Sequence, residues 1–306
     1  MTTTNSTPLS RLAMLKERAA IIQAVRSFFI DHGFLEVETP IRIPAPAPEA
    51  HIEPEPSGDW YLQTSPELCM KRLLAGGCPQ IFQICKCFRR HERGDRHLPE
   101  MTMLEWYRAG ADYRDLMTDC EGLFAALNAG RRLAQLDAGQ PIDLTPPWPR
   151  LTLAEAFRLY APISLTEAMA QGCFEEVLVC SVEPRLGHGF PVFLCDYPAS
   201  QASLASLHPD NPEIAQRFEL YYNGVELANG FTELTDAREQ RHRFEVEQDH
   251  IHSQGRVPPP MPEPFLTDLC RMPPAAGIAL GIDRLVMLLT GATNINQVVT
   301  FPPEGL

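Results

Sequence analysis

Basic side chains are concentrated in one short stretch of this chain. The whole sequence carries 26 Lys and Arg against 39 Asp and Glu, yet six basic residues fall within nine positions: Arg89, Arg90, His91, Arg93, Arg96 and His97. A planar guanidinium group binds two oxygens at once, so such a cluster fits a polyphosphate. The alternative is a solvated loop whose charges balance Glu92, Asp95 and Glu100. Composition alone leaves both interpretations open.

Carboxylates form the second group of candidate residues, around the dipeptide Asn223-Gly224. This dipeptide is typical of a two-residue hairpin turn, which would place Tyr221 opposite Glu226. Glu219 would then share a sheet face with Glu226. Two carboxylates on one face repel unless a cation lies between them, and Mg²⁺ on a nucleotide prefers one or two carboxylates plus phosphate oxygens. Two solvated acids on the wet side of a sheet are the alternative.

The stretch GIALGIDR at 277–284 adds a further cation. Gly281 allows a close approach between the backbone and a ligand. Arg284 falls in the first turn of the following helix, where acids are preferred. We therefore expect Arg284 to have an anionic partner, which is either a ligand or a nearby acid.

Two predicted strand pairs and one strand that leads into a helix would position these residues. Strands at 81–89 and 102–107 flank the basic loop, and period-two geometry places Glu105 and Tyr107 on one face of the second strand. Two short strands flank Asn223-Gly224. A strand at 277–282 runs into a helix at 283–290.

The remaining periodicity predicts helices separated by loops rich in proline. Helices are expected from Ser10 as the cap to Phe29, from Ser65 to 75, over 112–136 and over 236–252. A strand is expected over 34–39 and loops at 44–56 and 257–264. The stretch 140–205 shows no clear pattern. This order predicts a largely antiparallel α+β fold. It disfavours a Rossmann fold, and a GxxxxGK phosphate loop is absent from the sequence.

Composition limits the class of protein. The 306 residues are 44% hydrophobic with a net charge of −13, which argues against broad nucleic-acid binding. The N-terminus lacks the apolar core of a signal peptide, and the sequence has no segment that we expect to cross a bilayer. Nine cysteines without a CxxC pair indicate reduced thiols and a cytoplasmic protein.

Taken in order, these segments resemble the catalytic domain of class II aminoacyl-tRNA synthetases, and lysyl-tRNA synthetase most of all. The resemblance to the family's three motifs lies in FLEVETP at 34–40, FRRHERGDRHLPEMTMLEWY at 88–107 and GIALGIDRLVMLL at 277–289. Segments 64–77 (TSPELCMKRLLAGG) and 226–236 (ELANGFTELTD) resemble stretches that line the lysine pocket. The resemblance covers roughly 35–300 and implies a class II antiparallel sheet flanked by helices, as one catalytic domain over 1–306.

The same resemblance implies residue roles. Arg89 would hold the α-phosphate of ATP, and the outer phosphates would be held by Arg96, His97 and Arg284. The full ATP set is Arg89, Arg90, His91, Arg96, His97, Leu98, Met101, Glu226, Leu227, Gly281 and Arg284, with Arg89 and Arg284 as the catalytic pair. Glu219 and Glu226 would bind Mg²⁺. The amino-acid set is Ser65, Pro66, Glu67, Glu105, Tyr107, Asn229, Glu233 and Ala279, in which Glu67 takes the amino group near the carboxylate while Glu105 and Glu233 face the side-chain ammonium.

Four positions depart from the synthetase pattern. His91 stands where the family has Glu, and Met101 where it stacks adenine on Phe, so adenine contacts are expected to differ. Leu98 replaces an Asn and could serve only through its backbone. Ala279 replaces a Gly, and its methyl group narrows the pocket floor in a way that fits β-lysine.

The first catalytic helix is expected near Ser10, which leaves no room for the OB-fold that precedes the catalytic domain of lysyl-tRNA synthetases. The chain is therefore most similar to truncated paralogues that join (R)-β-lysine to a lysine of elongation factor P. This implies a cytoplasmic homodimer that uses ATP and Mg²⁺, with elongation factor P and (R)-β-lysine or lysine as partners, and without tRNA or membrane. A short lysyl-tRNA synthetase is the first alternative. A non-catalytic regulator is the second, disfavoured because Arg89, Arg284, Glu219 and Glu226 are retained.

Overall fold

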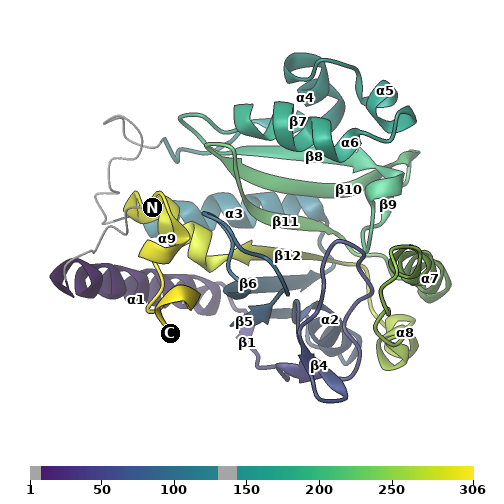
Figure 1. Cartoon of the computed structure of the whole chain (residues 1–306), viewed down its shortest axis with the longest axis horizontal. Coiled ribbons are helices and arrows are strands. Elements are labelled where there is room, and N and C mark those ends of the chain that lie inside the picture. Colours follow the sequence, from purple (N-terminus) through teal and green to yellow (C-terminus); the bar gives the residue numbers. More distant parts are fainter. Residues whose placement is uncertain (1–7, 130–142) are drawn as a thin grey trace.

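A nine-stranded sheet forms the centre of the molecule in the computed structural model, which describes residues 8–129 and 143–306 (Figure 1). Its order is β1 (Leu35–Glu36), β5 (Gln80–Phe88), β6 (Glu100–Ala109), β12 (Ala275–Gly281), β11 (Val225–Thr232), β10 (Asn211–Tyr222), β8 (Val192–Pro198) and β7 (Arg150–Thr152), with β9 (Leu207–His208) beside β10. The pairs β1–β5 and β7–β8 are parallel, and the other pairs are antiparallel. The predicted α+β class with a largely antiparallel sheet is confirmed.

One face of the sheet is covered by three helices: α1 (Pro8–Asp31), α3 (Tyr113–Asn128) and α9 (Ile282–Thr290). Alternate residues of the central strands point into this core, among them Trp106 on β6, Phe218 on β10 and Ile278 on β12, each at most 1% exposed. Because side chains alternate along a strand, the residues between them lie on the opposite face. That opposite face carries the polar side chains described below.

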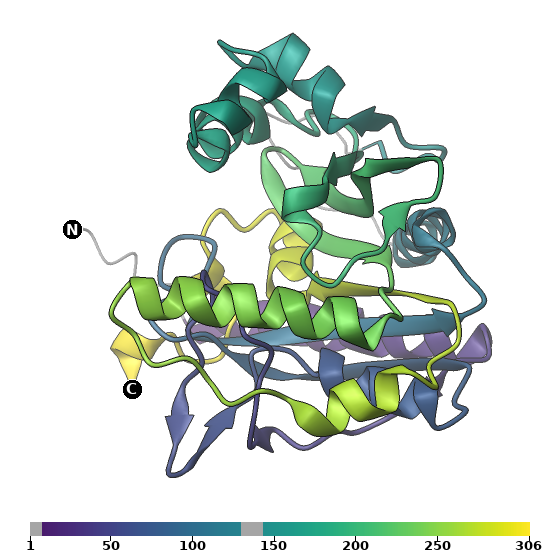
Figure 2. The same cartoon turned by 90° about the vertical axis from the view of Figure 1, so that its right-hand side faces the viewer.

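The opposite face is flanked at one edge by α2 (Glu67–Ala75), α7 (Ala237–Ser253) and α8 (Glu263–Leu269). Figure 2 shows α7 crossing the front of the molecule with α8 beneath it. Phe244 of α7 and Phe265 of α8 are buried together with Leu74 of α2. These helices wall the polar face on one side.

A smaller layer covers the far end of the sheet, at the top of Figure 1. It is built from α4 (Leu153–Tyr160), α5 (Leu165–Ala170) and α6 (Phe174–Val177). Phe157 stacks on Phe174 at 5.8 Å, and both pack with Tyr197 and Leu194 of β8. Capping boxes begin α4 at Thr152 and α5 at Ser164. Short helical turns complete the described fold at η1 (Leu178–Val182), η2 (Glu183–Arg185), η3 (Ala199–Gln201), η4 (Ile295–Gln297) and η5 (Pro303–Gly305).

The predicted strands around the basic loop, the hairpin at Asn223-Gly224 and the strand that runs into α9 are all confirmed. The predicted helix over 112–136 reaches Asn128 in α3, and its part within 130–142 lies outside the described residues. Helix α1 already includes Pro8, so Ser10 lies within it and is not its cap.

Two segments predicted as loops contain regular structure. The proline-rich stretch after Pro40 supplies a small sheet of β2 (Arg42–Ile43), β4 (Trp60–Leu62) and β3 (Pro56–Ser57). Helix α8 begins at Glu263, inside the predicted loop at 257–264, because Pro264 occupies the first turn of the helix, where proline is tolerated. Within the described residues, every helix is too short or too polar to cross a membrane.

Candidate functional site

Four polar or small residues form one row across the open face of the sheet. Glu105 on β6 pairs with Ala279 on β12, Ala279 pairs with Asn229 on β11, and Asn229 pairs with Glu219 on β10. Adjacent strands lie about 4.8 Å apart, so this row spans roughly 14 Å. It joins a candidate amino-acid pocket at one end to a candidate metal and phosphate region at the other.

The next row is formed by Tyr107, Gly277, Phe231 and Arg217. A Cβ atom at Gly277 would lie 2.2 Å from Cε1 of Tyr107 and 2.4 Å from Oε1 of Glu233. Glycine is therefore required at 277, because only its missing side chain leaves room for the ring and the carboxylate.

Glu105 is held in a fixed orientation at the centre of this pocket. Ser65 Oγ donates to Glu105 Oε1 at 2.6 Å, and the Tyr107 hydroxyl donates to Glu105 Oε2 at 2.7 Å. Burial, followed by the nearby Glu67, raises the pKa of Glu105 to about 7. A carboxyl poised in this way gains its charge readily when a cation arrives.

A lysine of the chain itself lies among the pocket acids. Lys71, 1% exposed, places its Nζ 2.5 Å from Glu67 Oε1 and 2.5 Å from Glu233 Oε2. Burial opposes its charge, but Glu233 and Glu67 outweigh burial and raise the pKa of Lys71. Its ammonium also lies 5.1 Å from the centre of the Phe231 ring, which adds a cation–π contact.

Glu233 lies between Gly277 and Lys71 and keeps one oxygen available. Burial raises the pKa of Glu233 to about 8, with Lys71 opposing the shift and Glu67 adding to it. Its Oε1 is buried without a hydrogen-bond partner among the described residues. An unpaired buried carboxylate oxygen is costly, so this atom is expected to receive a donor from a ligand.

Glu219 is surrounded by donors at the other end of the row. Arg217 donates to its Oε1 at 2.6 Å, and Tyr197 donates to its Oε2 at 2.7 Å. The Tyr221 hydroxyl lies 2.7 Å from Glu219 Oε2 and 3.0 Å from Glu183 Oε1, so it can donate to either. Burial, opposed by Arg217, raises the pKa of Glu219, and Glu226 adds to the rise.

The predicted placement of Glu219 and Glu226 on one face of the sheet involves a shift in strand register. Tyr221 pairs with Glu226 as predicted, and the register then shifts, so that Glu219 pairs with Asn229. This β-bulge adds one residue to β11 and keeps both acids on the open face.

Arg284 has the anionic partner that its position predicts. Its Nη1 donates to the Glu226 carbonyl at 2.7 Å and lies 3.3 Å from Glu226 Oε2. Its Nη2 donates to Nε2 of His97 at 2.5 Å, and burial, followed by the Arg284 charge, lowers the pKa of His97. Arg96 donates to the Gly224 carbonyl at 2.8 Å. The basic loop is thus joined to the hairpin and to the start of α9.

Arg89 lies at the base of this loop, at the end of β5. Burial opposes its charge, but Glu92 and Glu49 outweigh burial and raise the pKa of Arg89. Glu92 lies 3.5 Å away, and the buried Nε of Arg89 has no hydrogen-bond partner among the described residues. Arg89 therefore retains unused donor capacity beside the pocket, close enough to interact electrostatically with Glu226.

Other residues of the predicted ATP set lie in different surroundings. Arg90 pairs with Glu53 at 2.9 Å, and His91, with a side chain 70% exposed, lies 3.9 Å from the same carboxylate. Leu98 and Leu227 are buried in the core beneath the sheet, so only their backbones can reach a ligand. The other predicted members fall at strand and helix positions around the open face: Met101 on β6, Gly281 at the end of β12 and Pro66 at the start of α2.

Arg93 is occupied by a structural contact. It binds Glu304 through two bonds of 2.7 and 2.9 Å and donates to Asn296 at 3.1 Å. Asn294 donates to the adjacent Asp95 at 2.8 Å. These bonds attach the basic loop to residues near the C-terminus of the described chain.

Two carboxylates alone do not complete a metal site. Within the described residues, three His, Cys, Asp or Glu side chains are nowhere gathered closely enough to hold a metal ion. Glu219 and Glu226 instead fit Mg²⁺ that arrives on a nucleotide, because phosphate oxygens would supply the remaining ligands.

Several residues of the site were absent from the sequence prediction: Glu49, Lys71, Glu183, Tyr197, Arg217 and Phe231. Lys71 follows Glu67 by four residues on a helix, and Arg217 precedes Glu219 by two on a strand, so both were within reach of simple periodicity. Glu49 and Tyr197 come from segments that carry no such signal.

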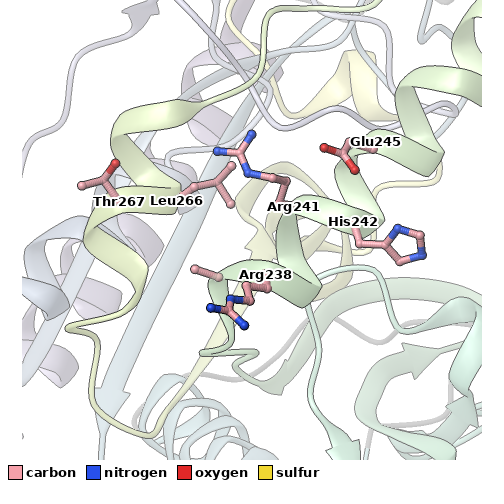
Figure 3. A pocket seen from close by; sticks show the side chains of 7 residues that line it. Arg238, Arg241, His242, Glu245, Leu266 and Thr267 are labelled. Atoms are coloured by element: carbon pink, nitrogen blue, oxygen red, sulfur yellow. The ribbon is translucent and has the colours of Figure 1, made fainter.

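A separate cavity of about 280 Å³ lies between α7 and α8, and none of the site residues lines it (Figure 3). Arg241 at its edge is paired with Glu263. Leu266 and Thr267 line it from α8.

Comparison with known proteins points to one family. A family model described as tRNA synthetases class II (D, K and N) matches residues 8–305. Curated proteins named elongation factor P–(R)-β-lysine ligase are similar over nearly the whole chain. Those of Salmonella gallinarum and Salmonella paratyphi B are each 40% identical, over 96% of this chain and 96% of their own.

Proposed function

Because this chain belongs to the class II tRNA synthetase family (D, K and N), we propose that it is an ATP-dependent ligase that activates (R)-β-lysine, or lysine, as an adenylate and transfers it to a lysine ε-amine of elongation factor P. The single observation that carries the proposal is that acids suited to a diamine and cations suited to a triphosphate border one open sheet face. Glu105 lies on this face in β6, and Arg284 at the start of α9 joins Glu226 of β11 to the basic loop. We further propose that residues 8–305 act as one catalytic domain.

In the first step the substrate carboxylate attacks the α-phosphorus of ATP, and pyrophosphate leaves. Two anions must approach each other, so Arg89, whose Nε has no partner among the described residues, lowers the barrier by binding the α-phosphate. Arg284, Arg96 and His97 hold the outer phosphates in exchange for their present contacts, which join Arg284 to Glu226 and to His97, and Arg96 to the Gly224 carbonyl. Mg²⁺ bound by Glu219 and Glu226 with the phosphates would offset further negative charge.

The pocket acids hold the two ammonium groups of the substrate. Glu105 and Glu233 lie beside Tyr107 at the closed end, where the terminal ammonium would bind. Glu67 takes the ammonium nearer the carboxylate. Ala279, in the same row as Glu105, narrows the floor between the two ends, which favours a β-amino acid.

In the second step the acceptor amine attacks the carbonyl carbon of the adenylate and AMP leaves. A new amide forms and the amine loses a proton. The donors around the α-phosphate hold the charge of the departing AMP. Elongation factor P acts in translation, so we propose that the protein is cytoplasmic.

The test is a paired assay of activation and transfer. ATP–pyrophosphate exchange should depend on (R)-β-lysine, and mass spectrometry should show one β-lysyl group added to elongation factor P while tRNA stays uncharged. Exchange without transfer to the protein, or charging of tRNA in its place, would contradict the proposal.

The pocket also predicts a pH dependence. Glu105 and Glu233 have pKa values raised to about 7 and about 8, and they bind ammonium groups only when ionised. Substrate affinity should therefore be low at acidic pH and should rise through these values. We expect kcat/KM for (R)-β-lysine in the exchange assay to increase roughly tenfold or more between about pH 6 and pH 8. A flat profile over this range would show that these acids do not bind the substrate.

We also propose that the protein is a homodimer formed through α1 and the edge strand β1. A groove of about 900 Å³ follows these elements, with Ile22, Val37 and Ile41 in its lining. Leu35 on β1 is 57% exposed beside it, and an exposed edge strand with apolar side chains is suited to a second copy.

The variant Leu35→Asp tests this interface. It should weaken the dimer by roughly 100-fold or more, since a buried Leu is worth roughly 1.5–3 kcal/mol in each copy. Sedimentation velocity measures the shift to monomer. Leu159→Asp is the matched control, because Leu159 is 52% exposed on α4 at the far end of the sheet. Equal effects of the two variants would count against this interface.

A further inference from the structure

Glu49 is an acid of the site that neither the motifs nor the comparisons single out. It lies in the segment between β2 and β3 and is half-buried. Its electrostatic neighbours are two groups with assigned roles, Glu67 and Arg89, together with Glu247 and Arg217. Arg89 in turn has Glu49 among its strongest neighbours. Glu49 therefore interacts electrostatically with both Glu67 and Arg89. Its segment also contacts the basic loop directly, because the Arg90 amide donates to the Glu53 carbonyl at 2.8 Å.

The backbone around Glu49 is fixed by α7 and the residues that follow it. The Ala50 amide donates to Glu247 Oε2 at 2.8 Å, and Arg256 donates to the Ala50 carbonyl. Ala50 itself is 5% exposed. The peptide next to Glu49 is thus anchored from both sides, while the acid's own side chain is left without such bonds.

The carboxylate of Glu49 forms no hydrogen bond and no ion pair within residues 8–129 and 143–306. Arg217 cannot provide one readily, because its three donor nitrogens are bonded to Glu219, Asn229 and the Gln201 carbonyl. Arg89 retains a buried Nε without a partner. Glu49 and Arg89 are electrostatic neighbours, and both keep binding capacity that no described residue uses.

Charge and donor count explain why a second acid is needed there. An ammonium group has three N–H donors. Glu67 already shares Oε1 with the internal ammonium of Lys71 at 2.5 Å, which leaves it one free oxygen. Burial, followed by Glu67, raises the pKa of Glu49 to about 7. A cation that binds beside Glu49 lowers this pKa again and favours the ionised carboxylate.

We propose that Glu49 is a substrate-binding residue that, together with Glu67, accepts hydrogen bonds from the substrate ammonium nearest the reacting carboxylate. This inference rests on the proposed function. Glu49 would then help to select the amino acid, from the segment between β2 and β3. The ammonium of a β-amino acid is separated from the carboxylate by one more carbon than in an α-amino acid, so it needs an acceptor beyond Glu67.

The experiment compares Glu49→Gln with the unaltered protein in the exchange assay. Loss of a hydrogen bond between charged groups should raise KM for (R)-β-lysine roughly 10- to 100-fold, with KM for ATP changed less than about twofold. The inhibition constant of 6-aminohexanoate, which lacks only the middle ammonium, should stay unchanged. Glu49→Asp should give an intermediate KM. Asp59→Asn is the control, because Asp59 is exposed in the same region.

Two results would overturn the assignment. One is an unchanged KM for (R)-β-lysine in Glu49→Gln. The other is an equal loss for (R)-β-lysine and 6-aminohexanoate, which would show that Glu49 acts only by holding its segment in place. Absence of exchange in the unaltered protein with either diamino acid would instead reject the proposed function, and this inference with it.

Discussion

Replacing Arg89 with Ala is expected to lower kcat/KM for ATP–pyrophosphate exchange by about 10³-fold. The barrier arises where a carboxylate approaches a phosphate, and we propose that Arg89 is the cation at that point. Its Nε is buried without a partner, and Glu49, Glu92 and Glu226 surround it with negative charge. Without its guanidinium, this part of the site would repel both reactants. Steady-state exchange at saturating Mg²⁺ measures the loss.

Arg89→Lys and Arg158→Ala make this prediction specific. Lysine keeps the charge but loses the planar pair of donors, so it should restore only part of the activity. Arg158 is exposed on α4, away from the open face, and its removal should leave exchange unchanged. If Arg89→Ala retained activity within tenfold of the unaltered protein, Arg89 would not bind the reacting phosphate.

The second large effect is on stability. Lys71→Met is expected to lower the free energy of unfolding by about 3 kcal/mol near pH 10, where Glu233 is ionised and the variant leaves it buried without its cation. The deficit should shrink as pH falls through about 8. The pKa of Glu233 is raised to about 8, so the carboxyl becomes neutral there and no longer needs Lys71. Urea unfolding at several pH values measures both effects.

A double variant separates charge from packing. Lys71→Met combined with Glu233→Gln should regain most of the lost stability, because the remaining partner, Glu67, has a side chain 16% exposed and can be reached by water. If the single variant lost less than about 1 kcal/mol, or its deficit were independent of pH, the ammonium would not be compensating buried carboxylates.

Local rules predicted the parts of the site that lie on regular strands. Glu105 and Tyr107 were placed on one face by period two, and the hairpin turn placed Tyr221 opposite Glu226. The register of Glu219 depends on a β-bulge, which a turn rule does not include. The roles of these residues toward ATP and the amino acid come from the resemblance to class II synthetases, and the variants above test them.

Contacts between distant segments were beyond the same rules. The peptide next to Glu49 is held in place by Glu247 and Arg256, which follow it by about 200 positions. Prolines at 44–56 indicated a loop, and the small sheet they help to form depends on pairing with β4. The sequence does not predict helix α8, because proline in the first turn of a helix is also typical of a loop.

The most direct test of the central claim is a crystal structure of the protein with ATP, Mg²⁺ and (R)-β-lysine. We predict density for a β-lysyl adenylate whose phosphate contacts Arg89, whose terminal ammonium lies between Glu105 and Glu233, and whose other ammonium lies at Glu67. An occupied nucleotide site elsewhere, or an amino acid bound with its carboxylate directed away from Arg89, would contradict the account.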